Sequence, residues 1–172
     1  MLESVLIKHE NVLQFISDFY HKPFDDLFKV DDNGHDQLIN FEITTWDALD
    51  NFHDNHCSYF MLLDQKKKEI VGIIKFSETL SPYGFKKSMT NLGGCMYYVE
   101  ISKKYRGQHL LSALTDMFAD SYKGKFFISN SETEDGMNAN VNQHLDTAFT
   151  KKGIKFFYSQ EEFLNDYKNN LI

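Results

Sequence analysis

Two long apolar runs joined by a short polar stretch constrain the fold of this 172-residue chain most strongly. Residues 59–63 (Tyr-Phe-Met-Leu-Leu) and 70–76 (Ile-Val-Gly-Ile-Ile-Lys-Phe) flank the hydrophilic residues 64–69. Runs rich in aromatic and β-branched residues, separated by a polar turn, indicate the two strands of a β-hairpin. Because both runs are apolar almost throughout, we expect them at the centre of a sheet.

The segments around this hairpin alternate between strand and helix patterns. Hydrophobic periodicity, capping residues and glycine or proline breaks locate these segments. Upstream, we expect a strand at 4–8, a helix from Val12 that ends before Pro23, and a short helix at 46–53 capped by Thr45. Downstream, we expect strands at 95–101, 125–129 and 155–158, and helices at 107–122, 142–152 (ended by Gly153) and 160–168. This order predicts a single mixed α/β domain over residues 1–172.

Composition excludes several classes of protein. No apolar run approaches the roughly 18 to 20 residues of a membrane-spanning helix, so a transmembrane protein is not expected. The first ten residues lack the apolar core of a secretory signal, which predicts a cytoplasmic location. The two cysteines, Cys57 and Cys95, form no Cys-x-x-Cys pattern, so free thiols are expected.

The charge is negative and unevenly distributed. The net charge is −7, and residues 23–60 carry nine acidic side chains against Lys29 alone. Nucleic-acid binding depends on clustered basic residues, so this distribution argues against a nucleic-acid partner. The acidic stretch is either a solvated surface or an electrostatic funnel for a cationic ligand. Of the 18 basic residues, seventeen are lysine and only Arg106 is arginine.

Metal and serine-nucleophile chemistry have weak support in the sequence. His53, His56 and Cys57 lie close together, but no second ligand pair with zinc spacing accompanies them. We therefore expect no metal site. The chain has no Gly-x-Ser-x-Gly motif, which marks the nucleophile of one large class of hydrolases.

The most informative segment is a strand that continues through a basic turn into an amphipathic helix. Strand 95–101 is followed by Lys103, Lys104, Arg106 and Gly107. The N-terminus of a helix presents unpaired backbone N–H groups, and a nearby arginine adds planar donors for phosphate oxygens. This segment is either a phosphate or pyrophosphate site or only a tight strand-to-helix turn.

These motifs resemble the GNAT superfamily of N-acetyltransferases over residues 57–158. The family's Tyr-Arg-Gly corresponds to residues 105–107, and its Ser-Ala-Leu to residues 112–114. Its Asn-x-x-Ala-x-x-Leu-Tyr-x-x-x-Gly-Phe element resembles residues 142–154. Ile-Val-Gly-Ile-Ile at 70–74 resembles the family's strand before the cofactor strand. The resemblance implies a GNAT-like fold, with a mixed, mainly antiparallel central sheet flanked by helices, and acetyl-CoA as co-substrate.

The resemblance also implies which residues bind acetyl-CoA. Backbone amides of the turn, together with the arginine, would hold the pyrophosphate, the main chain at the end of the strand would pair with pantetheine, and the asparagine would orient its amide. The residues at these positions are Ile101, Arg106, Gly107, Gln108, His109, Leu110, Leu111, Ser112 and Asn142.

The sequence departs from the family at four positions. His109 and Leu111 stand where the family has small residues, Phe149 where it has a proton-donating tyrosine, and Cys95 where some members have a glutamate. The expected base is therefore Glu100 or Glu78, although either could be only an exposed strand charge. Tyr97, Tyr98 and Tyr158 are alternative proton donors, although buried tyrosines are more often core residues.

The expected function is transfer of an acetyl group from acetyl-CoA to a primary amine, directly, in a ternary complex. The acceptor would be a small molecule or a protein, and the acidic stretch favours a cationic one. The alternative is a non-catalytic GNAT-like module that senses acyl-CoA or binds other proteins. The sequence does not fix the oligomeric state.

Overall fold

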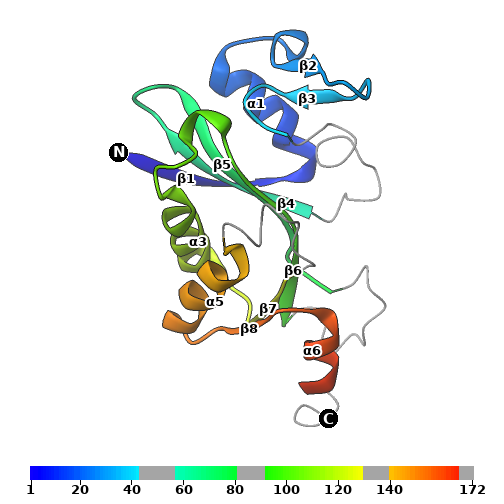
Figure 1. Ribbon diagram of the computed structural model, residues 1–172, viewed down its shortest axis with the longest axis vertical. Helices are drawn as coiled ribbons and strands as arrows, with labels where there is room; N and C mark the ends of the chain where they lie inside the picture. Colours follow the sequence, from blue (N-terminus) through cyan, green and yellow to red (C-terminus); the bar gives the residue numbers. More distant parts are fainter. Residues whose placement is uncertain (43–56, 81–91, 130–139, 167–172) are drawn as a thin grey trace. The chain divides into compact units, whose positions relative to one another are not determined.

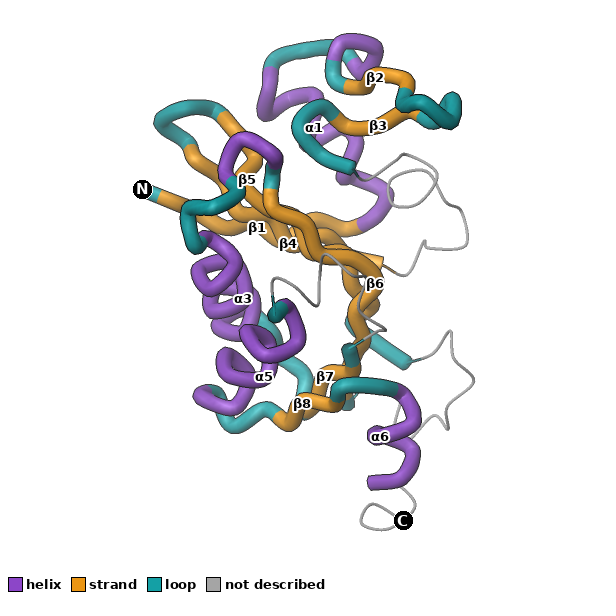
Figure 2. Tube along the Cα trace, in the orientation of Figure 1, coloured by secondary structure: helices purple, strands orange, loops and turns teal. Residues whose placement is uncertain are grey.

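The computed structural model describes residues 1–42, 57–80, 92–129 and 140–166, and Figures 1 and 2 show an α/β arrangement. The strands are β1 (Leu2–Lys8), β2 (Phe28–Val30), β3 (Asp36–Leu38), β4 (Cys57–Asp64), β5 (Glu69–Ser77), β6 (Gly93–Ile101), β7 (Phe126–Ile128) and β8 (Lys155–Phe157). The helices are α1 (Val12–Tyr20), α3 (Leu110–Ser121), α5 (Val141–Lys151) and α6 (Gln160–Asp166). Short 3-10 turns lie at His9–Asn11, Phe24–Asp26 and Lys103–Tyr105.

The main sheet has six strands in the order β1-β4-β5-β6-β7-β8. Strands β1 and β4 are antiparallel, whereas β6, β7 and β8 are parallel neighbours. The predicted hairpin is confirmed as β4 and β5, with Lys68 in the left-handed region (φ 55°) and the Lys67 N–H donating to Asp64 Oδ1 at 3.1 Å. The predicted class is also confirmed: a mixed, mainly antiparallel sheet flanked by helices, consistent with a GNAT-like fold.

A second sheet, β2–β3, is absent from the sequence predictions. Its turn is closed by Asp31, whose Oδ1 accepts the N–H groups of Asn33 and His35, both at 2.9 Å. Gly34 has φ +82°, a left-handed conformation that glycine adopts without strain. The dipeptide Asn33-Gly34 is itself a hairpin signal, so the sequence contains a local indication of this sheet.

Most other expected elements are present with shifted ends. Helix α3 begins at Leu110 rather than at 107, β7 covers 126–128, and α5 covers 141–151 and is followed by Gly153 with φ +71°. The expected helix at 46–53 lies outside the described residues. The C-terminal helix is confirmed as far as Asp166.

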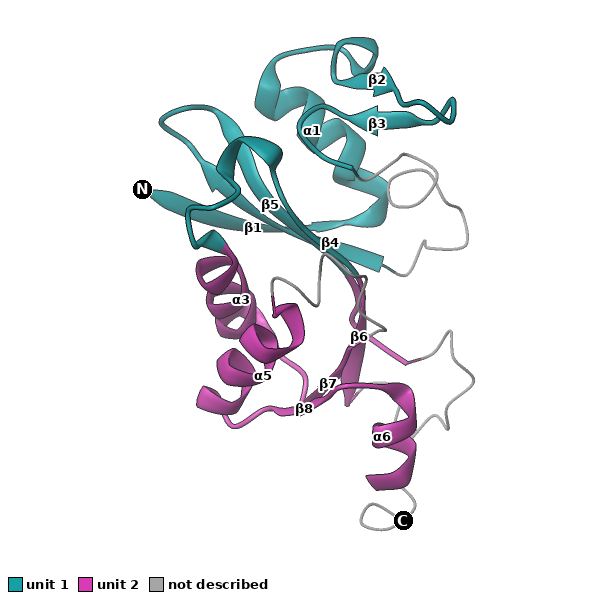
Figure 3. Ribbon diagram, in the orientation of Figure 1, with its two compact units in different colours: residues 1–75, 98–110 teal, residues 76–97, 111–172 magenta. Residues whose placement is uncertain are grey.

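The chain divides into two compact units, coloured separately in Figure 3. Unit 1 comprises residues 1–75 and 98–110, and unit 2 comprises residues 76–97 and 111–172. Strands β5 and β6 contribute to both units. The expectation of a single domain over the whole chain stays a prediction.

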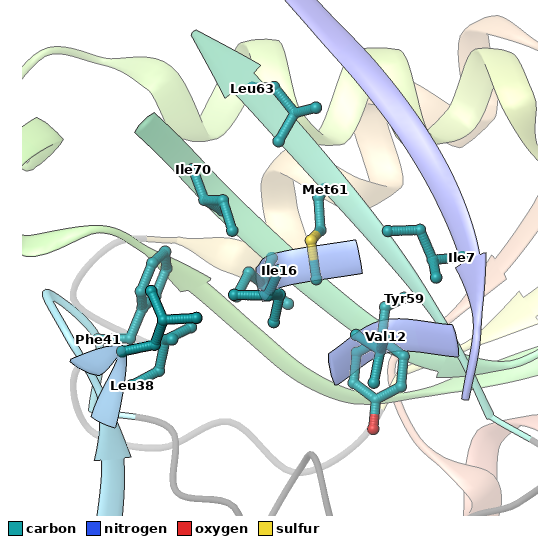
Figure 4. Close-up of a cluster of buried hydrophobic side chains, with 11 residues drawn as sticks. Ile7, Val12, Ile16, Leu38, Phe41, Tyr59, Met61, Leu63 and Ile70 are labelled. Atoms are coloured by element: carbon teal, nitrogen blue, oxygen red, sulfur yellow. The ribbon is translucent and has the colours of Figure 1, made fainter. Parts of the chain in front are cut away.

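In unit 1, helix α1 packs on alternate residues of β4. Val12 and Ile16 lie one helical turn apart, and both are buried against a cluster that includes Tyr59, Met61 and Leu63 (Figure 4). Residues two apart on a strand point to the same face, so these β4 side chains form one apolar surface. This packing explains the helical spacing of apolar residues in α1.

In unit 2, alternate residues of β7 pack against different helices. Phe127 lies 5.5 Å from Phe118 of α3 and 5.0 Å from Phe149 of α5, measured between ring centroids. Phe126 stacks on Phe163 of α6 at 4.9 Å. Because neighbouring residues of a strand point to opposite faces, helices cover both faces of β7.

Candidate functional site

The turn after β6 is anchored within unit 1. The Ser102 N–H donates to the Val71 carbonyl oxygen at 2.8 Å, and the Lys103 N–H donates to the Asn40 carbonyl oxygen at 2.8 Å. The buried Tyr105 donates its hydroxyl to Asp64 Oδ2 at 3.1 Å. The position of this turn is therefore set by the β4–β5 hairpin and by the segment after β3.

Two left-handed residues follow Arg106. Gly107 has φ +78° and His109 has φ +58°, and both residues are exposed. The expectation that a helix begins at 107 is wrong, because left-handed residues interrupt a right-handed helix. A Cβ at Gly107 would meet no atom within 4 Å, so glycine is required here by its backbone conformation and not by close packing.

This turn combines two left-handed residues with the start of a helix. Backbone N–H groups of some turns and of helix N-termini can bind anions, and helix α3 begins at the next residue, Leu110. Gln108 is exposed and donates from Nε2 to the Lys104 carbonyl oxygen at 3.4 Å. His109 keeps a positive φ at a position where the GNAT pattern has a small residue.

Glu100 is a buried acceptor that joins three parts of unit 1. Its Oε1 accepts the Tyr98 hydroxyl at 2.6 Å, and its Oε2 accepts Arg106 Nη2 at 2.9 Å. Both oxygens accept the Glu42 backbone N–H, at 3.0 and 2.7 Å. The alternative of an exposed strand charge is wrong, because only 6% of the Glu100 side chain is exposed.

These contacts suit Glu100 to an anchoring role. A general base needs an oxygen available to the substrate proton, and each oxygen of Glu100 already accepts at least two donor contacts. Sequence reasoning identified Glu100 but missed Glu42, because the contact joins residues 58 positions apart. Whether Glu100 serves as a base stays a prediction.

Arg106 is held by the same network. Its Nη2 pairs with Glu100, its Nε donates to the Ile101 carbonyl oxygen at 3.2 Å, and its Nη1 lies 3.7 Å from Glu42 Oε1. The side chain remains 45% exposed. Arg106 therefore links the end of β6 to the turn and still reaches solvent.

Burial raises the pKa of Tyr98 well above the ordinary tyrosine value, and the nearby Glu100 carboxylate raises it further. Burial raises the pKa of Tyr20 to about 12, although the Ile70 N–H that it accepts lowers the pKa in part. A neutral tyrosine is thus favoured in the folded state at both positions.

We expect stability to fall as the pH rises above the unfolded-state pKa of about 10. Above this pH, the unfolded state has released tyrosine protons that the folded state still holds. The stabilisation is therefore complete below pH ~10 and is lost as the pH rises through the folded-state pKa values. Tyrosinate absorbance should show a step near pH 12 to which Tyr20 and Tyr105 both contribute, so Tyr20→Phe should remove only part of it. Tyr98→Phe should reduce the alkaline loss of unfolding free energy, and an identical profile in this variant would contradict the assignment.

Ser102 has a buried hydroxyl with no hydrogen-bond partner among the described residues. An unpaired buried hydroxyl costs about 1–3 kcal/mol. We therefore expect Ser102→Ala to leave the unfolding free energy unchanged or to raise it by up to about 2 kcal/mol in urea denaturation. A loss of more than about 1 kcal/mol would show that the hydroxyl has a structural partner.

Asn142, which is predicted to orient the pantetheine amide of acetyl-CoA, lies in unit 2. Ser129 directly follows β7, and Asn142 lies in the first turn of α5. The Ser129 hydroxyl donates a hydrogen bond to Asn142 Oδ1. The pairing of β6 with β7 covers only the first three residues of β6 and ends at Cys95 opposite Ile128. Asn142 is therefore held beside the carboxyl end of β7.

Phe149 is a core residue and not part of an exposed site. It is completely buried, and its ring packs against Phe118, Tyr122, Phe127 and Phe156. The position at which the family has a tyrosine is thus inside the aromatic core of unit 2. A tyrosine hydroxyl there would lie in an apolar environment.

The remaining sequence candidates lie in separate places. Glu78 is half-buried and directly follows β5. Tyr97 is half-buried and packs on the cluster around Phe126, whereas Tyr158 is exposed and donates to Asp146 Oδ2 at 2.6 Å.

Within unit 2, the start of α3 carries the last two predicted loop residues. Leu111 is half-buried and Ser112 is exposed.

Both cysteines are buried thiols that form no disulfide. In the part of the chain that the structure describes, no three His, Cys, Asp or Glu side chains come together as a metal site. His53 and His56 lie outside that part. Across the same described ranges, no helix combines the length and apolar character needed to cross a membrane.

The comparisons with known proteins assign no family. No protein-family model matches this chain, and no curated protein matches it.

Proposed function

We propose that this protein is an acetyl-CoA-dependent N-acetyltransferase of GNAT type that acts on a primary amine by direct transfer, in the cytoplasm. The observation that carries the proposal is the turn of residues 106–109. It presents an arginine and two left-handed residues to solvent and leads into helix α3. Backbone donors of this kind suit the pyrophosphate of a coenzyme A thioester.

Two features support the same function. Ser129 fixes the side chain of Asn142 beside the carboxyl end of β7, as a residue that orients the pantetheine amide requires. Strand β6 also continues for six residues beyond its last pair with β7, from Met96 to Ile101. The main chain near Ile101 would pair with the pantetheine arm, with the pyrophosphate at Gly107 to Ser112.

Acetyl-CoA supplies the activated thioester: as the C–N bond to the amine forms and the C–S bond breaks, the amine loses one proton and the thiolate gains one. Proximity supplies most of the rate in such a transfer. Glu78 and Glu100 remain the two predicted bases. Glu100 would position the turn through Arg106.

A non-catalytic acyl-CoA-sensing or protein-interaction module is the second candidate. Phe149 favours this candidate, because a buried phenylalanine has no proton to give to the departing thiolate. Under this reading the turn still binds coenzyme A, but no acetyl group is transferred.

A cationic acceptor, such as a polyamine, an aminoglycoside or a lysine side chain, is part of the proposal. The acidic residues Asp25, Asp26, Asp32, Asp36 and Glu42 are exposed in unit 1. A charge-steered acceptor should show a Michaelis constant that rises with salt. A constant independent of salt would remove this part of the proposal.

The test combines acetyl-CoA titration by calorimetry with an assay of thiol release over a panel of amines. Arg106→Ala should weaken binding, whereas Lys104→Ala is the matched control, because Lys104 is an exposed cation of the same turn paired with Glu69. Circular dichroism checks that both variants fold. Binding with thiol release supports an enzyme, and binding without release supports the sensing module. No binding at millimolar acetyl-CoA would overturn both.

A further inference from the structure

The three nitrogens of the Arg106 guanidinium make contacts of unequal length. Nη2 contacts the buried Glu100 at 2.9 Å, and Nε contacts the Ile101 carbonyl oxygen at 3.2 Å. Nη1 contacts Glu42 Oε1 only at 3.7 Å. Two of the three nitrogens thus donate to groups of the fold, and the third makes only a loose ion pair.

The loose pair is also the exposed one. Half of the Glu42 side chain is exposed, against 6% for Glu100. Exposed ion pairs contribute little to the free energy of folding, because water and salt compete for both partners. An anion of the ligand that approaches Arg106 from solvent would therefore compete with Glu42 for Nη1.

The backbone keeps the Glu42 carboxylate near Arg106. The Glu42 N–H donates to both oxygens of Glu100, and the Glu42 carbonyl oxygen accepts Gln37 Nε2 at 3.0 Å. Both bonds use main-chain atoms, so they fix the residue without using its side chain. The Glu42 main chain is therefore held close to the guanidinium, and its half-exposed carboxylate lies 3.7 Å from Nη1.

We propose that Glu42 is an internal competitor for Arg106 that lowers the affinity of the turn for a pyrophosphate-type anion. The inference rests on the proposed function, because it assumes that the turn binds such an anion. A ligand pyrophosphate replaces the Glu42 carboxylate at Nη1, while Glu100 and Ile101 keep the guanidinium in place. Glu42 thus sets how much anion is needed to occupy the site.

The chain offers a direct probe of this pair. Arg106 is the only arginine, so its Nε–Hε group gives the single arginine side-chain signal in a nitrogen-15 NMR spectrum. This signal can be followed during titration with inorganic pyrophosphate and, separately, with acetyl-CoA. The comparison is between the wild-type protein, Glu42→Gln and Glu69→Gln.

Glu69→Gln is the matched control. Glu69 forms an ion pair with Lys104 of the same turn at 2.7 Å, so its substitution removes one negative charge without touching Arg106. Glu42→Gln should lower the half-saturating pyrophosphate concentration about two- to fivefold, the size expected for one exposed ion pair. Glu69→Gln should change the half-saturating pyrophosphate concentration less than about 1.5-fold. High salt should reduce the difference in this concentration between Glu42→Gln and the wild-type protein.

Each outcome decides the inference. Tighter pyrophosphate binding in Glu42→Gln alone supports the inference. Pyrophosphate binding in this variant when the wild-type protein shows none also supports it. Unchanged binding in Glu42→Gln, or an equal change in Glu69→Gln, overturns it; if the wild-type protein still binds acetyl-CoA, the proposed cofactor site survives. If no protein shifts the signal with either ligand at millimolar concentration, the inference and the proposed anion site both fail.

Discussion

Replacing Glu100 by alanine is expected to lower the unfolding free energy by about 2–4 kcal/mol. The substitution leaves three donors without their acceptor: the Tyr98 hydroxyl, the Glu42 N–H and Arg106 Nη2. The loss is smaller than for a completely buried ion pair, because Arg106 is partly exposed and water can solvate it. Urea denaturation monitored by circular dichroism measures the change.

Glu69→Ala is the control for this experiment. Glu69 also pairs with a cation of the turn, Lys104, but 55% of that lysine side chain is exposed. We expect a cost below about 1 kcal/mol. If both alanine variants lost the same small amount, Glu100 would not be the anchor of the turn.

Phe149→Ala should cost about 3–5 kcal/mol, because a completely buried aromatic ring is removed from a cluster of four other rings. Phe24→Ala is the matched control: its side chain is 39% exposed, and we expect a cost below about 1 kcal/mol. Chemical denaturation of the two variants side by side measures the difference.

Phe149→Tyr tests the role of this position in chemistry. The added hydroxyl would be buried among aromatic rings and should cost about 1–3 kcal/mol. We expect little change in thiol release, since the ring packs in the core. A large gain in turnover without loss of stability would show that position 149 reaches the reacting atoms.

The structure also explains why some residues of the candidate site stand out in the sequence. Arg106 and Gly107 stand out locally, because a lone arginine and a glycine mark the turn between a strand and a helix. Asn142 was found through a motif, and its position near the start of α5 is confirmed. Glu42 had no such signal, since its partners Glu100 and Arg106 are far away in the sequence.

By itself, the sequence determined the hairpin of β4 and β5, the helical faces of α1, α3 and α5, and the termination of α5 shortly before Gly153. These features follow from side-chain periodicity and backbone preference, which act over a few residues. The tertiary structure alone decided that Glu100 is buried, that Phe149 lies in the core, and that α3 begins after two left-handed residues. Such outcomes depend on which residues, distant in the sequence, come into contact, form hydrogen bonds with one another and fill the space between them. No local sequence pattern carries that information.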